Sequence, residues 1–151
     1  MESRSIVVSG EPMVSLLNRL LQSCGLTDLQ AVLPGKEKKK VLLVADREPM
    51  LRYVSGFQRC LASYPLREDP RLHSVQLFTY SLESDSADYN ARGLHVTPQG
   101  YTAFEIVGVG CIGRVRLKSL AEGEEERILA AVAAAVVCGA PLAKVLSCLQ
   151  A

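Results

Sequence analysis

The residues best placed to do chemistry are Ser9, Gly10, Glu11 and Pro12. They join a short β-branched run, Ser5–Val8, to a helical pattern, and phosphate-binding loops are built at such strand–turn–helix junctions. In those loops, backbone N–H groups and the helix dipole point at the anion. Here the turn has one glycine, Glu11 adds a negative charge and Pro12 removes an N–H donor. We therefore interpret these four residues as a vestigial loop and expect no nucleotide binding there.

A run of lysines, at positions 36 to 40, is the second candidate site. Its cations are Lys36, Lys38, Lys39 and Lys40. The run is either a contact for an anion or nucleic acid, or a solvated connector before a buried strand. A short cluster without interleaved aromatic residues favours the connector, and the net charge of +1 does not call for a nucleic-acid partner.

The remaining reactive side chains form no catalytic or metal-binding pattern. His73 and His95 have no cysteine at a ligand spacing, and Asp85 and Asp88 lie in a polar turn. Cys111, between Gly110 and Gly113 in a hairpin turn, is the least buried candidate for a thiol nucleophile, and the criteria for nucleophile activation disfavour it. We therefore expect no catalytic residue, no metal ion and no cofactor.

Composition places the chain among globular proteins of one domain. It has 151 residues, of which 48% are hydrophobic and 22% charged. The longest apolar stretch, Ile128–Cys138, is too short to span a bilayer, so we expect no membrane association. The N-terminal residues MESRS lack the apolar run of a secretory signal. The five cysteines form no CxxC pair and lie mostly in apolar surroundings, which predicts buried, reduced thiols in an intracellular, reducing compartment. This compartment is the cytoplasm, or an organelle if a transit peptide has been removed.

The elements that position these residues in the first half of the chain alternate between strand and helix. Apolar residues at three- and four-residue intervals predict a helix over Met13–Cys24, and Thr27–Leu33 suggests a second, short helical piece. The continuous apolar run Val41–Ala45 is typical of a strand buried on both faces. Asp46 is predicted to cap a further helix that ends at Tyr64, before a strand over Val75–Tyr80. This order predicts parallel strands joined by βαβ crossovers.

The second half of the chain has a different pattern. Tyr89–Thr97, Tyr101–Val107 and Cys111–Leu117 are predicted strands separated by short turns, which is typical of antiparallel hairpins. An alanine-rich helix is predicted from Glu124 to Cys138, and a last helix starts at Pro141. The whole chain therefore predicts a three-layer α/β fold: a mostly parallel sheet with βαβ crossovers, a C-terminal antiparallel hairpin region and two closing helices.

Three stretches together resemble the central, ATP-binding domain of the Mur ligase family, which includes the folylpolyglutamate synthetases. The opening IVVSGEPMVSLLNRLLQSCGL resembles the family's strand, TGTNGKT phosphate loop and first helix. VLLVADREPMLRYV resembles the strand that ends in Asn-x-Asp-Asp-Pro. The stretch from VQLFTY to the end, with ILAAVAAAVVCGAPL, resembles the end of the domain in the order of its elements. The resemblance covers residues 1–151 as a single, internally shortened domain without the family's flanking domains.

The departures from the family pattern concern the residues that act on ATP. The phosphate-loop lysine and hydroxyl are absent, and the strand end retains Asp46 but has Val44 and Arg47 beside it. Where the family has asparagines near adenine, this chain has Glu124 and Arg127. The resemblance therefore implies a degenerate ATP-binding domain, a pseudoenzyme.

Three functional hypotheses follow. The first is a non-catalytic structural or interaction subunit of a larger intracellular assembly, with protein partners. The second is one half of a split ATP-dependent amide ligase, whose partner chain supplies the phosphate loop. The third, weaker one is a small module that binds an anion or nucleic acid through the lysine run. Homo-oligomerisation stays open.

Overall fold

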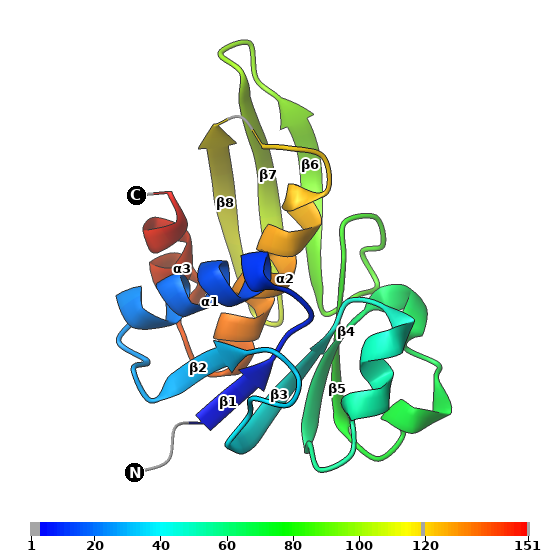
Figure 1. Ribbon diagram of the computed structural model, residues 1–151. Helices are drawn as coiled ribbons and strands as arrows, with labels where there is room; N and C mark the ends of the chain where they lie inside the picture. Colours follow the sequence, from blue (N-terminus) through cyan, green and yellow to red (C-terminus); the bar gives the residue numbers. More distant parts are fainter. Residues whose placement is uncertain (1–3, 119, 151) are drawn as a thin grey trace.

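The computed structural model describes residues 4–118 and 120–150, which form an eight-stranded sheet covered by helices (Figure 1). The strand order is β2-β1-β3-β4-β5-β6-β7-β8. The strands are β1 (Arg4–Val7), β2 (Leu29–Val32), β3 (Lys39–Ala45), β4 (Arg59–Ser63), β5 (Gln76–Ser81), β6 (Tyr89–Val96), β7 (Tyr101–Gly108) and β8 (Cys111–Lys118).

Strand directions confirm the predicted fold class. All neighbouring strands from β2 to β6 in the sheet pair in parallel, whereas β6–β7 and β7–β8 pair antiparallel. The parallel and antiparallel parts meet at β5 and β6, which pair through two residues each, Tyr80 with Tyr89 and Ser81 with Asn90. The sheet is therefore continuous from the parallel half to the hairpins.

The larger hydrophobic core lies between the sheet and three α-helices: α1 (Glu11–Ser23), α2 (Glu124–Val137) and α3 (Leu142–Leu149). Eight consecutive residues of α2, Ile128–Ala135, are buried, and this helix contacts both α1 and α3 as well as the sheet. The alanine side chains of α2 are small, so α1, α3 and the sheet can pack close to its backbone. The three α-helices expected from apolar spacing are confirmed.

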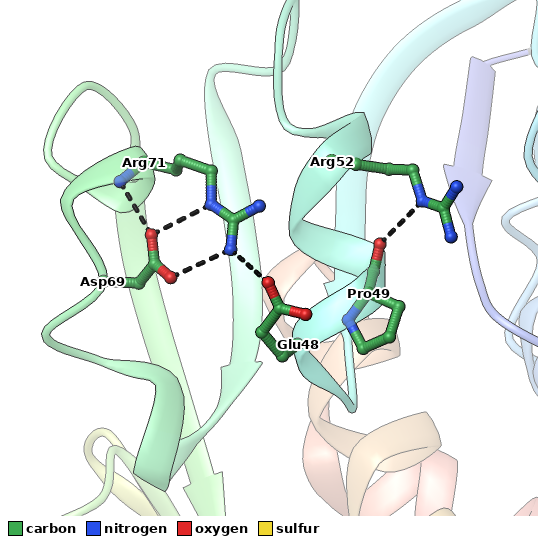
Figure 2. Close-up of polar contacts among 5 residues, drawn as sticks. All are labelled: Glu48, Pro49, Arg52, Asp69 and Arg71. Carbon is green, nitrogen blue, oxygen red and sulfur yellow. Dashed lines mark hydrogen bonds and ion pairs between the residues drawn. The ribbon is translucent and has the colours of Figure 1, made fainter.

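The opposite face of the parallel strands carries a smaller core and short 3₁₀ helices. These are η1 (Glu48–Tyr53), η2 (Tyr64–Leu66) and η3 (Pro70–Leu72). Arg71 joins η3 to η1: its Nη2 lies 3.0 Å from Asp69 Oδ2 and 2.6 Å from Glu48 Oε1 (Figure 2). Hydrogen bonds from the Arg71 side chain lower the pKa of the Asp69 carboxyl. The third layer of the fold is thus built from 3₁₀ turns.

The predicted helix at Thr27–Leu33 is wrong, because this segment contains the edge strand β2. Asn18 of α1 explains the change. Its Oδ1 accepts a hydrogen bond from the N–H of Ala31 at 2.7 Å, and its Nδ2 donates to the Ala31 carbonyl at 3.1 Å. The side chain thereby satisfies the outer backbone groups of an edge strand, which is a tertiary contact and leaves no local signal.

The predicted helix from Asp46 to Tyr64 is also wrong. The segment holds the 3₁₀ helix η1, a turn with Gly56 at φ +88°, and strand β4. Cys60, Leu61 and Ala62 are fully buried in succession, because β4 lies inside the sheet and both of its faces are covered. Such a run resembles a buried helix segment when apolar spacing is the only guide.

The cysteines are less buried than expected. Cys60 alone among them is buried, and the other four are half-buried; all five are free thiols. Burial raises the pKa of Cys60 to about 12 and that of Cys138 to about 11. Among the described residues, no helix has the length and apolarity needed to cross a membrane.

Candidate functional site

A cavity of about 430 Å³ lies at the carboxyl ends of the parallel strands. Ser9 follows β1, Asp46 follows β3, and Tyr80 belongs to β5; the N-terminal turns of α1 and α2 close the other sides. Open parallel sheets bind ligands at this edge, outside the strand ends. The cavity therefore brings three residues of the predicted vestigial loop, Ser9, Gly10 and Pro12, together with Asp46.

Ser9 and Asp46 are hydrogen-bonded across neighbouring strands. The Ser9 hydroxyl donates to Asp46 Oδ2 over 2.9 Å, and Arg47 Nε lies 3.8 Å from the same oxygen. The Arg47 side chain is 74% exposed, so this ion pair is weak. The Ser9 hydroxyl therefore directs its hydrogen-bond donor at the Asp46 carboxylate.

Two buried polar atoms at this site have no hydrogen-bond partner among the described residues: Asp46 Oδ1 and the Tyr80 hydroxyl. Tyr80 is 1% exposed. Burial raises the pKa of Tyr80, and the nearby acids Asp46 and Glu126 raise it further, so the phenol stays protonated and is available as a donor. Unpaired buried polar atoms are rare in folded proteins. Sequence reasoning missed Tyr80, because a tyrosine in the run VQLFTY is equally consistent with an ordinary core position.

The start of α1 offers few donors to an anion. Pro12 has no N–H, and the N–H groups of Met13 and Val14 both donate to the Gly10 carbonyl at 3.1 Å. Among the first three residues of this helix, Glu11 alone therefore keeps an N–H that is not bonded to Gly10, and Glu11 is an acidic residue that does not line the cavity. The Gly10 φ of −156° is ordinary extended backbone, so the turn lacks the left-handed glycines that curl a phosphate loop around its ligand.

The start of α2 forms the opposite wall of the cavity. Gly123, Glu126, Arg127 and Ala130 line it. Glu124 turns away, since its Oε1 accepts a hydrogen bond from the N–H of Ala121 at 2.9 Å. Glu126 and Arg127 give this wall one negative and one positive charge. The sequence singled out Arg127 by resemblance, whereas the charge run around Glu126 was attributed to helix-dipole stabilisation alone.

The lysine run lies far from this cavity. Lys39 and Lys40 begin β3, whereas Asp46 follows its other end, about 20 Å away for a strand of this length. The Nζ of Lys40 donates to the Ser55 carbonyl at 3.1 Å and lies 5.5 Å from the centre of the Phe57 ring. Anion contact by Lys36, Lys38, Lys39 and Lys40 stays a prediction, and it concerns a different end of the sheet.

Histidines and acids do not gather into a metal site in the part of the chain that the structure describes. His73 and His95 are both exposed, on separate elements. Asp88, from the polar turn at residues 81–88, accepts hydrogen bonds from the Thr79 N–H at 2.9 Å and from the Thr79 hydroxyl at 3.2 Å. That carboxylate therefore fixes the crossover between β5 and β6.

Comparison with known proteins identifies the fold. The chain matches no family profile, and no curated protein sequence is significantly similar to it. Solved structures are similar: UDP-N-acetylmuramoyl-L-alanyl-D-glutamate–2,6-diaminopimelate ligase has a TM-score of 0.68 and 12% identity, with 97% of this chain and 45% of the ligase covered. MurF ligase from Thermotoga maritima in complex with ADP has a TM-score of 0.68 and 11% identity, with 97% and 48% covered.

A murein peptide ligase from Psychrobacter arcticus gives the same result, with a TM-score of 0.69, 10% identity, and 98% of this chain and 46% of the ligase covered. The chain thus spans slightly less than half the length of these enzymes. Nearly all of it takes part in the match, from β1 to α3, so the resemblance found in three sequence stretches extends to the whole architecture. The chain has a Mur ligase-like α/β fold.

Proposed function

We propose that the chain is a non-catalytic Mur ligase-like domain that acts as a structural or interaction subunit of a larger intracellular assembly. One observation carries the proposal: at the start of α1, Pro12 has no N–H, and the N–H groups of Met13 and Val14 are already bonded to the Gly10 carbonyl. A triphosphate needs several such donors together with a lysine or a metal ion. The chemistry at the strand ends therefore disfavours nucleotide binding.

The charges around the cavity support the same conclusion. Asp46 and Glu126 face the cavity together with Arg47 and Arg127, so its walls have no excess of positive charge. Glu11, in the first turn of α1, adds a carboxylate where the helix dipole would otherwise favour an anion. MurF, which holds ADP in its solved structure, has the same fold; the expectation for this chain is that the fold is retained and the nucleotide is not.

A retained core without a working site is consistent with a role in assembly. Two buried cores hold the sheet between its layers, while the residues that would act on ATP have changed. Fold and function are separable in this way, because active-site residues are few and contribute little to the core. We propose that residues 1–151 act as a single domain whose partners are proteins.

The test is a calorimetric titration of the full chain with Mg-ATP and with ADP. We expect no heat of binding and no rise in Tm at about 1 mM nucleotide, since a ligand present at 100 times its Kd stabilises by about 2.7 kcal/mol. The Thermotoga maritima MurF ligase is the positive control in the same buffer with ADP. Binding by this chain alone with a micromolar Kd refutes the proposal.

One observation favours the second candidate, one half of a split ATP-dependent amide ligase. The chain spans 45% to 48% of the ligases it matches, so more than half of such an enzyme has no counterpart in these 151 residues. The cavity is open to solvent and retains Asp46 at a strand end. This candidate predicts co-purification with a chain that carries TGTNGKT, and ATP turnover in the mixture but in neither component alone.

A further inference from the structure

The outer face of β6, β7 and β8, turned away from the α-helices, has no covering layer among the described residues. The core on that side of the sheet is built from β1, β3, β4 and the 3₁₀ region, and none of its members belongs to β6–β8. Figure 1 shows these three strands rising away from the 3₁₀ helices that cover β3 to β5. A sheet face without cover is a candidate interaction surface.

The pairing register shows which side chains occupy this face. Phe104, Ile106 and Val115 point to the helices and are buried. The alternate positions point outward and pair as Arg92 with Glu105, Glu105 with Arg114, and Ala103 with Arg116. We define the outer β6–β8 face by the residues Arg92, His95, Tyr101, Ala103, Glu105, Val107, Ile112, Arg114, Arg116 and Lys118.

Positive charge dominates this face. Arg92, Arg114, Arg116 and Lys118 oppose one carboxylate, Glu105, so four cations minus one anion give a net charge of +3 in a chain whose total is +1. Glu105 is shared between two arginines at long range, 3.6 Å from Arg92 and 3.7 Å from Arg114. Arg114 is 89% exposed, so its charge remains available to a partner.

The cations surround an apolar hollow. A depression of about 400 Å³ is lined by Ala103, His95, Glu105 and the three arginines Arg92, Arg114 and Arg116. A β-bulge between Arg92 and His95, with Gly93 at φ +67°, shapes its rim. The Arg116 guanidinium lies 4.5 Å from the centre of the Tyr101 ring, which restrains both side chains before binding.

The outer β6–β8 face also carries exposed apolar side chains at the end of the β7–β8 hairpin. Ile112 is 56% exposed and pairs with Val107 on the same face. Arginine and tyrosine are among the residues that contribute most at protein interfaces. Charge and composition therefore specify a partner with carboxylates next to an apolar side chain.

We infer that the outer β6–β8 face docks an extended, acidic segment of a protein partner. Its carboxylates pair with Arg92, Arg114 and Arg116, and an apolar residue of the segment packs on Val107 and Ile112. This inference rests on the proposed role as an interaction subunit and names the chemistry of the partner. A nucleic acid fits less well, because four cations on one face are fewer than the phosphate contacts of a typical binding site.

The test is a selection of random 12-residue peptides, displayed on phage, against the full chain immobilised through its N-terminus. We expect enrichment of peptides that carry two or more Asp or Glu together with an aliphatic or aromatic residue. A synthetic copy of the enriched peptide should bind at least tenfold more weakly to the Arg114→Glu/Arg116→Glu variant, and its Kd should rise with salt.

The matched control is the Lys36→Glu/Lys38→Glu variant, which lowers the net charge of the chain by the same amount as Arg114→Glu/Arg116→Glu. Lys36 and Lys38 lie before β3, away from the outer β6–β8 face. It should bind the peptide as the unchanged chain does, and circular dichroism should show both variants folded. Equal loss in both variants, selection of peptides without acidic residues, or tighter binding of a 12-nucleotide single-stranded RNA than of the peptide overturns the inference. Nucleotide binding at the cavity would refute the proposed inactivity and leave this result unchanged, so the two failures are distinguishable.

Discussion

The Tyr80→Phe substitution should stabilise the protein. The Tyr80 hydroxyl is buried without a hydrogen-bond partner among the described residues, while the ring is enclosed in the main core. Leaving a buried donor unpaired costs about 1–3 kcal/mol, and phenylalanine preserves the packing of the ring. We therefore expect the free energy of unfolding to increase by about 1 kcal/mol, equivalent to a Tm increase of about 2–4 °C for a chain of this size.

The assay is urea unfolding followed by circular dichroism, with the Tm from calorimetry as a second readout. Tyr64→Phe is the matched control: Tyr64 is half-buried beneath Arg67, and its change should stay within about 0.5 kcal/mol. A loss of 1 kcal/mol or more in Tyr80→Phe refutes the reasoning. Such a loss would mean that the Tyr80 hydroxyl has a hydrogen-bond partner in solution, such as a water molecule shared with Asp46 Oδ1. The changes in unfolding free energy of Asp46→Asn and Tyr80→Phe would then not add up in the double variant.

Three further substitutions test the fold. Asn18→Ala should cost about 2–3 kcal/mol in urea unfolding, because it removes both hydrogen bonds to the backbone of Ala31; a cost below 0.5 kcal/mol would show that water replaces them. The pKa of Cys60 is raised from 9.0 to about 12, so the thiol ionises in the unfolded chain at a lower pH than in the folded chain. Its contribution to stability is therefore complete below pH 9, and the free energy of unfolding should fall by about 4 kcal/mol as pH rises to 12. Cys60→Ala should reduce this fall by about that amount, and an unchanged pH profile would contradict the prediction. Gly113→Ala should destabilise by about 1–3 kcal/mol, because the added Cβ would collide with Leu146 Cδ1. The double variant with Leu146→Ala should lose less stability than the sum of the two single variants, and simple additivity would argue against that contact.

The sequence predicted elements whose own residues determine them. The helical spacing of Met13, Leu17, Leu20 and Leu21 corresponds to the buried face of α1, and the short glycine turns between β6, β7 and β8 correspond to antiparallel hairpins. These signals are local, because a helix face or a hairpin turn is specified within a few residues. They were sufficient to place the fold class correctly.

The errors arose where distant residues decide the structure. β2 is a strand because the Asn18 side chain completes its edge, and β4 is a strand because its neighbours cover both faces. The cavity shows the same limit: Ser9 and Asp46 were noted separately, but their hydrogen bond joins residues 37 positions apart. Tyr80 could have been found only from the sheet order, which places β5 in the same parallel sheet as β1 and β3, with β4 between β3 and β5.

The cavity and the outer β6–β8 face can be tested independently, because their lining residues do not overlap. The cavity lies at the carboxyl ends of the parallel strands, where open α/β sheets bind ligands, and we propose that it does not bind a nucleotide. The outer face lies on the antiparallel extension and carries a net positive charge. Tyr80→Phe should therefore change stability without changing the Kd for an acidic peptide, whereas Arg114→Glu/Arg116→Glu should do the reverse. Coupling between the two sets, measured in the combined variant, would indicate that the sheet transmits a change from one site to the other.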